Sequence, residues 1–302
     1  MIKRKHTSFI LTPIVNVLEE AINATSGIED SISSFPIWEY ILQSVFLRMT
    51  GFQEQKLKCI IWELSTDDYE YRYKTLQNKL GECSNFDDKK KIFKDLIEAL
   101  KSNGQLNIIV PEEKLDRYIK CIEKNNKNRE KIDIICECFK KSLEKSQLIN
   151  IFKESFDKLD YLIINSRLCK SRLRDFYSFK LIYAELLFEI GSSLGEQNKY
   201  KKIKDIVLMK NNRIEKINKC IDSSVDVLLS AFSLFENVYK NYLYKHRNRV
   251  AHNLLSYQQN LPTLSKLKEK NNKYENYFLY FFMLIFIDEL FIYLYKKYLK
   301  LS

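Results

Sequence analysis

The chain has 302 residues, of which 45% are hydrophobic and 13% aromatic, so general disorder is excluded and a sizeable core is expected. Only 6 glycines and 4 prolines are present, which is too few for the tight turns of a β-sandwich, a β-barrel or a Gly-rich phosphate loop. The 50 Lys and Arg residues outnumber the 39 Asp and Glu residues. This basic balance fits either a polyanionic partner such as nucleic acid or an evenly spread Lys-rich surface.

Helices are predicted along the N-terminal half of the chain. Apolar spacing predicts a first helix from Pro13 to Ala24 and a long amphipathic helix from Pro36 to Leu64. A link is expected from Ser65 to Tyr69. Further helices are expected at residues 69–80, 87–102, 113–125, 128–143 and 147–165. The composition and these elements together predict an all-α fold, an elaborated helical bundle.

The segment from Ser166 to Lys180 has the densest run of arginines in the chain. It is a candidate for a domain boundary or for an anion-contacting surface, and an ordinary solvated helix face explains the same pattern. We therefore divide the chain into residues 1–165, a regulatory part or an elaboration of the bundle, and residues 166–302. A helix from Phe176 to Gly195 should open the second part.

The C-terminal part is expected to contain three more helices. A capping box at Ser223 and Asp226 and apolar spacing predict a helix from Ser224 to about His246. Shorter and longer helices should follow at residues 262–270 and 274–300. The apolar stretch from Tyr277 to Tyr295 is interrupted by Asp288 and Glu289, which are expected at the edge of a buried face. It therefore predicts a core helix, with a membrane-attached effector as the open alternative.

No metal or other cofactor is expected. The 7 cysteines are an odd number, and the only close pair, Cys136 and Cys138, has no second pair or histidines nearby. Reduced thiols in a cytoplasmic protein explain them. Loops and helix starts explain the acidic pairs at residues 67–68 and 87–88. Trp38 and Trp62 are expected to anchor the core or an interface.

One window of the chain concentrates groups that could do chemistry. It runs from Tyr244 to Asn253 and holds two of the three histidines, two arginines and two asparagines. Imidazole can give and take a proton near neutral pH, and guanidinium matches the oxygens of a phosphate. If the helix continues, Asn248 and His252 share one face, and Arg247 can reach the same anion. These groups suffice for RNA cleavage without a metal.

The run Arg247-Asn248-Arg249-Val250-Ala251-His252 resembles the signature of the HEPN domain family. The resemblance implies a HEPN-like core of four to five helices within residues 166–302 and a homodimer whose two motifs face one cleft. It also implies a metal-independent endoribonuclease of the toxin or abortive-infection class in antiviral defence. Arg247, Asn248 and His252 would be catalytic. Lys245, His246 and Arg249 are candidates for contacts with the RNA substrate.

The resemblance has a departure and leaves alternatives open. A subset of HEPN domains carries a tyrosine two residues after the histidine, where this chain has Leu254. We therefore do not expect control by modification of that tyrosine, and expect instead a masking surface, an inhibitory partner or antitoxin, or an infection trigger. The alternatives are a catalytically silent member of the same fold, an ordinary helix end with Arg247 and Arg249 in solvent, and a non-catalytic helical RNA-binding or protein-interaction scaffold.

Overall fold

The computed structural model describes residues 4–29, 31, 34–77, 83–102, 145–164, 166–193, 229, 232–233, 235–252 and 274–299. These residues are mostly helical and include no strand, which confirms the predicted all-α class. The HEPN-like core stays a prediction. The expected helices at residues 113–125, 128–143 and 262–270, the capping box at residues 223–226 and the pair Cys136 and Cys138 lie outside the described residues.

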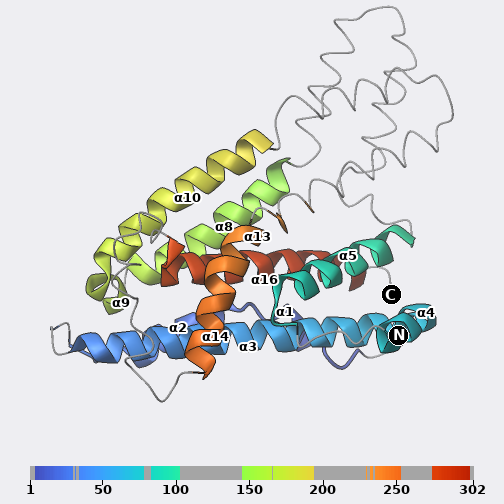
Figure 1. The fold of residues 1–302 in the computed structure, drawn as a ribbon, viewed down its shortest axis with the longest axis horizontal. Coiled ribbons are helices and arrows are strands. Elements are labelled where there is room, and N and C mark those ends of the chain that lie inside the picture. Colours follow the sequence, from blue (N-terminus) through green and yellow to red (C-terminus); the bar gives the residue numbers. More distant parts are fainter. Residues whose placement is uncertain are drawn as a thin grey trace, which may run out of the picture.

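The core is built around one apolar helix, α16 (Tyr277–Leu299). Nearly every side chain of α16 up to Leu294 is buried. Figure 1 shows α16 running through the middle of the described helices, with α3 (Phe35–Asp67) along one side and α8 (Lys145–Ile164) and α10 (Leu173–Ser193) along the other. The length and composition of α16 would suffice to cross a membrane, but 83% of its most apolar window is buried inside the protein. The prediction of a buried helix is therefore confirmed for the described structure.

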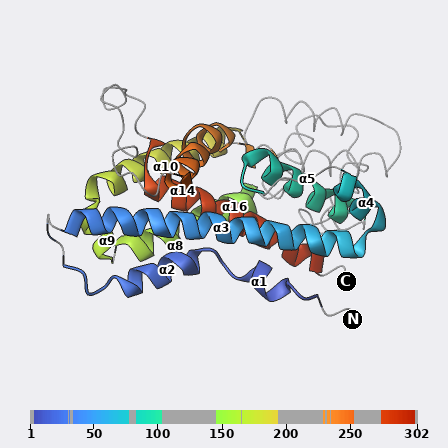
Figure 2. The ribbon, with the colours of Figure 1, turned by 60° about the horizontal axis from the view of Figure 1, so that its bottom comes forward.

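The long helix α3 runs parallel to α16. Gln53 donates a hydrogen bond to the carbonyl oxygen of Leu284 (3.1 Å), and Lys56 pairs with Asp288 one turn further along both helices. Two shorter helices, α1 (Thr7–Leu11) and α2 (Val15–Ala24), lie along α3 (Figure 2). The prediction of a single first helix from Pro13 missed α1. It also placed the start of α2 two residues early.

The predicted link from Ser65 to Tyr69 is wrong because α3 continues to Asp67. Only Asp68 separates α3 from α4 (Tyr69–Gln77), and its backbone is extended (φ −128°, ψ 113°). The Asp68 carboxylate accepts a hydrogen bond from the Tyr71 backbone N–H (3.1 Å) and so caps α4. One capping residue is enough to change direction, and no longer loop is needed.

The boundaries of α5 (Phe86–Ser102), α8 and α10 lie close to the predicted ones. The arginine-dense segment forms a short helix, α9 (Arg167–Ser171), and the first turns of α10. Two of its cations are used inside the fold: Arg172 pairs with Glu39, and Lys180 pairs with Asp160 (2.7 Å). The described helices on both sides of residue 165 contribute to one hydrophobic core. The division into two parts stays a prediction.

Two expectations about single residues are wrong. Asp288 is not at the edge of a buried face: its side chain and that of Lys56 are each only 1% exposed, and their charged atoms are 2.5 Å apart. The Asp288 carboxylate also accepts a hydrogen bond from the Ile14 backbone N–H (2.9 Å). Trp38 is buried as predicted, whereas Trp62 is 65% exposed and is not a core residue.

Candidate functional site

The candidate residues lie on α14 (Tyr244–His252), which continues a π-helical turn, η3 (Tyr239–Leu243). The predicted end of this helix at His246 is wrong. The chain has no glycine or proline between Leu243 and His252, and Val250 is buried against the core, so the helix continues through the whole motif. Arg247, Asn248 and His252 therefore share one helix, with His252 one turn beyond Asn248. Nothing is described of the His252 side chain.

Arg247 and Asn248 are held together, and Arg247 is also held by the long helix α3. One guanidinium nitrogen of Arg247, Nη1, donates to the Asn248 side-chain oxygen (3.1 Å). The other, Nη2, lies 3.4 Å and 3.5 Å from the two carboxylate oxygens of Glu54. The Arg247 side chain is 22% exposed and that of Glu54 is 11% exposed. Arg247 is thus pre-oriented at the border between the core and the solvent.

His246 is placed differently from the other motif residues, because its ring is packed inside the fold. The ring lies 5.3 Å from that of Phe46 and 5.4 Å from that of Tyr280, measured between centroids. Burial lowers the pKa of His246 to about 3, and the positive charge of Arg249 lowers it further in the same direction. His246 is therefore neutral near pH 7 and is a poor contact for a phosphate.

Both ring nitrogens of His246 have a partner. Nδ1 lies 2.7 Å from Nη2 of Arg249, and Nε2 lies 2.9 Å from the Tyr277 hydroxyl. Guanidinium can only donate, so Nδ1 accepts and the proton of the neutral ring is on Nε2. Nε2 then donates to the Tyr277 oxygen, and the Tyr277 hydroxyl donates to Glu39 (3.3 Å). This chain of hydrogen bonds fixes the ring and the direction of the Arg249 side chain.

Glu39 connects this chain of hydrogen bonds to a third part of the fold. It lies on α3, and its second carboxylate oxygen accepts from Arg172 in the turn between α9 and α10. Arg172 also lies 4.3 Å from the ring centroid of Phe35 at the start of α3. The face of α14 that carries His246 and Arg249 is therefore tied to α3, α10 and α16.

The remaining candidate, Lys245, is exposed. Its Nζ lies 3.4 Å from the side-chain oxygen of Asn241, one turn earlier on the helix. Lys245 is thus free to move toward an anion. The six candidates divide accordingly: Lys245 faces solvent, Arg247 and Asn248 lie at the border, and His246 and Arg249 form part of a packed network.

Sequence reasoning missed the residues that hold the motif in place. Glu54 and Glu39 contact it from α3, and Tyr277 contacts it from α16. A signal for Glu54 was present, because it lies among apolar positions of an amphipathic helix, where an unpaired carboxylate would be costly. The sequence gives no partner for such a residue, so the pairing with Arg247 could not be read from it.

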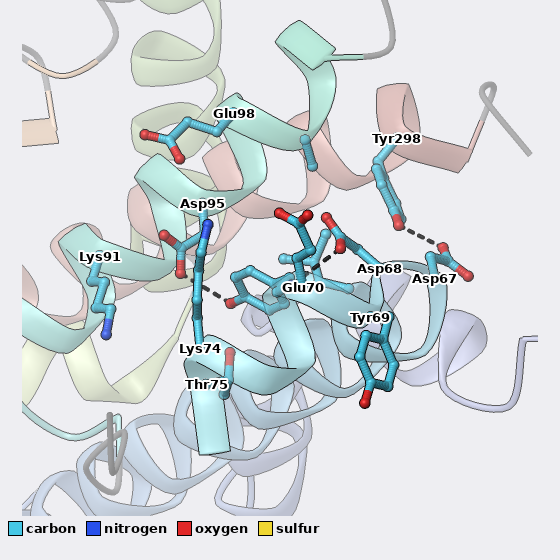
Figure 3. Close-up of a pocket in the computed structure, with 13 residues that line it drawn as sticks. Asp67, Asp68, Tyr69, Glu70, Lys74, Thr75, Lys91, Asp95, Glu98 and Tyr298 are labelled. Carbon is cyan, nitrogen blue, oxygen red and sulfur yellow. Dashed lines mark hydrogen bonds between the residues drawn. The ribbon is translucent and has the colours of Figure 1, made fainter. Parts of the chain in front are cut away.

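The structure also has a cavity of about 570 Å³ at the other end of α3, between α4, α5 and α16 (Figure 3). Its charged lining is mainly acidic: Asp67, Asp68, Glu70, Lys74, Lys91, Asp95 and Glu98. Two of these carboxylates accept hydrogen bonds from tyrosines, Asp95 from Tyr71 (3.0 Å) and Asp67 from Tyr298 (2.5 Å). No group of three or more His, Cys, Asp or Glu residues in the described part of the chain is placed to hold a metal ion.

Comparison of the chain with protein-family models, with curated proteins and with solved structures gave no match.

Proposed function

We propose that this protein is a metal-independent endoribonuclease of the HEPN type, with its HEPN-like core in residues 166–302. The observation that supports this is the continuity of α14, which carries Arg247, Asn248 and His252 on one helix with Asn248 and His252 a turn apart. The proposal includes a homodimer in the cytoplasm, with RNA as the substrate. It also includes a role as a toxin or in abortive infection, restrained by an inhibitory partner or antitoxin.

The chemistry follows from the properties of the three side chains. Arg247 would bind the scissile phosphate and stabilise the charge that develops on its oxygens in the transition state. His252 would move the proton of the attacking 2′-hydroxyl or of the leaving 5′-oxygen. Asn248 holds one side of the guanidinium through its amide oxygen. Lys245 would add a mobile phosphate contact, and His246 would position Arg249 rather than touch the RNA.

We expect His252→Ala and Arg247→Ala each to reduce RNA cleavage by about 10²- to 10⁴-fold, the usual effect of removing a proton-transfer group or a charge-stabilising donor. The measurement is the initial rate of cleavage of an unstructured RNA in EDTA. His6→Ala is the matched control, because His6 lies beside Trp62 at the opposite end of α3. Cleavage that persists in His252→Ala, or that needs Mg²⁺, would contradict the proposal.

The second candidate function is a helical RNA-binding or protein-interaction scaffold without turnover. The observation in its favour is the ion pair between Arg247 and Glu54, which is also what an ordinary contact between two helices would use. Under this reading the wild-type protein binds RNA in a salt-sensitive manner and gives no cleavage product.

A further inference from the structure

A fully buried lysine lies beneath the proposed site. Lys89 is in the first turn of α5 and is 1% exposed. Its Nζ donates a hydrogen bond to the carbonyl oxygen of Cys83 (2.9 Å) and lies 5.7 Å from the ring centroid of Tyr239 in η3. Burying an ammonium group is costly unless opposite charge lies nearby. The neighbours of Lys89 therefore indicate what this charge does.

The charged neighbours of Lys89 include both members of the ion pair on α14 and α3. Burial lowers the pKa of Lys89 to about 8; Glu54, Cys83 and Asp88 act in the opposite direction, and Arg247 lowers the pKa further. Glu54 thus lies within electrostatic reach of Lys89 while it pairs with Arg247. The three groups form a set of two positive charges and one negative charge.

This set has a consequence for binding an anion. Arg247 and Glu54 alone are neutral as a pair, and Glu54 would compete with an incoming phosphate for the guanidinium. A second cation behind Glu54 satisfies the carboxylate from the other side and leaves the set with a net positive charge. Interactions among these three charges are strong because Lys89 and most of Glu54 are shielded from water.

We propose that Lys89 is a positioning residue for the nuclease site, in that its ammonium group balances Glu54 so that Arg247 can transfer its hydrogen bonds from this carboxylate to an RNA phosphate. This inference rests on the proposed function. Lys89 does not touch the RNA and acts only through Glu54 and Arg247. It is distinct from the motif itself, because it comes from α5, more than 150 residues earlier in the chain.

The proposal predicts a dependence on pH. The groups that face Lys89 are Glu54 from α3, Asp88 from α5, Cys83 before α5, Tyr239 from η3 and Arg247 from α14. When Lys89 loses its proton above about pH 8, Glu54 is left with Arg247 as its main counter-charge. Arg247 then stays on Glu54, and binding of RNA weakens.

The test uses the full chain and a 2′-O-methyl RNA oligonucleotide, which carries the phosphates but cannot be cut. We expect the affinity of the wild-type protein to fall about tenfold between pH 7 and pH 9.5, as for the loss of one phosphate contact. Lys89→Met should bind about tenfold more weakly at pH 7 and show no further fall. The matched control Lys94→Met, an exposed lysine on the same helix, should keep the wild-type pH profile.

The double variant Lys89→Met/Glu54→Gln separates charge balance from a structural role. Once the carboxylate is gone, no counter-charge is needed, so affinity at pH 7 should return to within about threefold of wild type and stay flat with pH. A wild-type profile that is flat between pH 7 and pH 9.5, or a double variant as weak as Lys89→Met, overturns the proposal. Failure of the nuclease proposal is seen separately: the wild-type protein then binds the oligonucleotide but leaves 2′-hydroxyl RNA uncut.

Discussion

At the scale of single residues, the motif contains two histidines with opposite placement. His252 ends α14, whereas His246 is packed between Phe46, Tyr277 and Tyr280 with both ring nitrogens engaged. Two histidines in one window look equivalent in a sequence, and both were candidates there. Their difference arises because helix periodicity turns one toward α3 and α16. Only the packing of those helices reveals this.

The buried His246 should make the protein less stable in mild acid. Its pKa is about 3 in the folded state against an ordinary value of 6.5. Between these two values the unfolded chain binds a proton that the folded chain does not, so the free energy of unfolding falls as the pH falls below 6.5. The fall from this group is at most about 1.4 kcal/mol per pH unit.

We expect His246→Gln, which lacks this titration, to be less stable than wild type at pH 7 by about 1–2 kcal/mol, since it loses ring packing and one hydrogen bond. The difference should shrink by about 1–2 kcal/mol at pH 5, because only the wild type loses stability through His246. Urea unfolding at the two pH values measures this. An equal difference at both values would show that His246 is not held neutral.

At the scale of elements, the π-helical turn η3 precedes the motif. A π-turn takes more residues than an α-turn, so it changes the face on which every later residue lies relative to a uniform helix. Apolar spacing alone therefore predicts that a helix exists here but not which way the motif faces. The extension through His252 was likewise missed because Lys245 and His246 resemble the basic residues that often end a helix.

Continuity of α14 between Arg247 and His252 can be tested by Ala251→Pro. Proline at this position removes the hydrogen bond to the carbonyl of Arg247 and clashes with that carbonyl, at a cost of about 3 kcal/mol. We expect cleavage to be lost while the rest of the bundle stays helical by circular dichroism. Ala251→Gly is the control, because it costs about 1 kcal/mol and keeps the hydrogen bond. Full activity of the proline variant would refute a role for this helical spacing.

At the scale of the whole molecule, α16 joins the first and last parts of the chain. The buried pair of Lys56 and Asp288 connects α3, α16 and the segment before α2, where the Thr12 carbonyl accepts from Lys56 (2.6 Å) and the Ile14 N–H donates to Asp288. Such a pair adds little net stability when intact but is costly to break. It therefore specifies the register of α3 on α16 more than it strengthens the core.

We expect Lys56→Met or Asp288→Asn alone to lower the free energy of unfolding by about 3–5 kcal/mol, since each leaves an uncompensated buried group. The double variant Lys56→Met/Asp288→Leu should recover most of this loss because no buried charge remains. Urea unfolding of the three variants measures the coupling. Additive losses in the double variant would show that the two residues do not act as a pair.

The same scale shows what the sequence could and could not predict. The positions of α3, α5, α8, α10 and α16 followed from apolar spacing and from few glycines and prolines, because these are local properties of the chain. The partners of Lys56, Glu54 and Lys89 did not, because each ion pair joins residues that are distant in the chain. A charged residue among apolar positions signals a buried partner without naming it. For the candidate site, sequence could predict Arg247, Asn248 and His252, whereas Glu54, Glu39, Tyr277 and Lys89 required the packing of α3, α5 and α16.

The central claim is that Arg247 and His252 cut RNA by attack of its own 2′-oxygen. The most direct measurement is the chemistry of the new ends after incubation of RNA with the wild-type protein in EDTA. The account predicts a 2′,3′-cyclic phosphate and a 5′-hydroxyl, both absent with His252→Ala. Products that carry a 5′-phosphate, or the same cyclic ends from the His252→Ala protein, would contradict it.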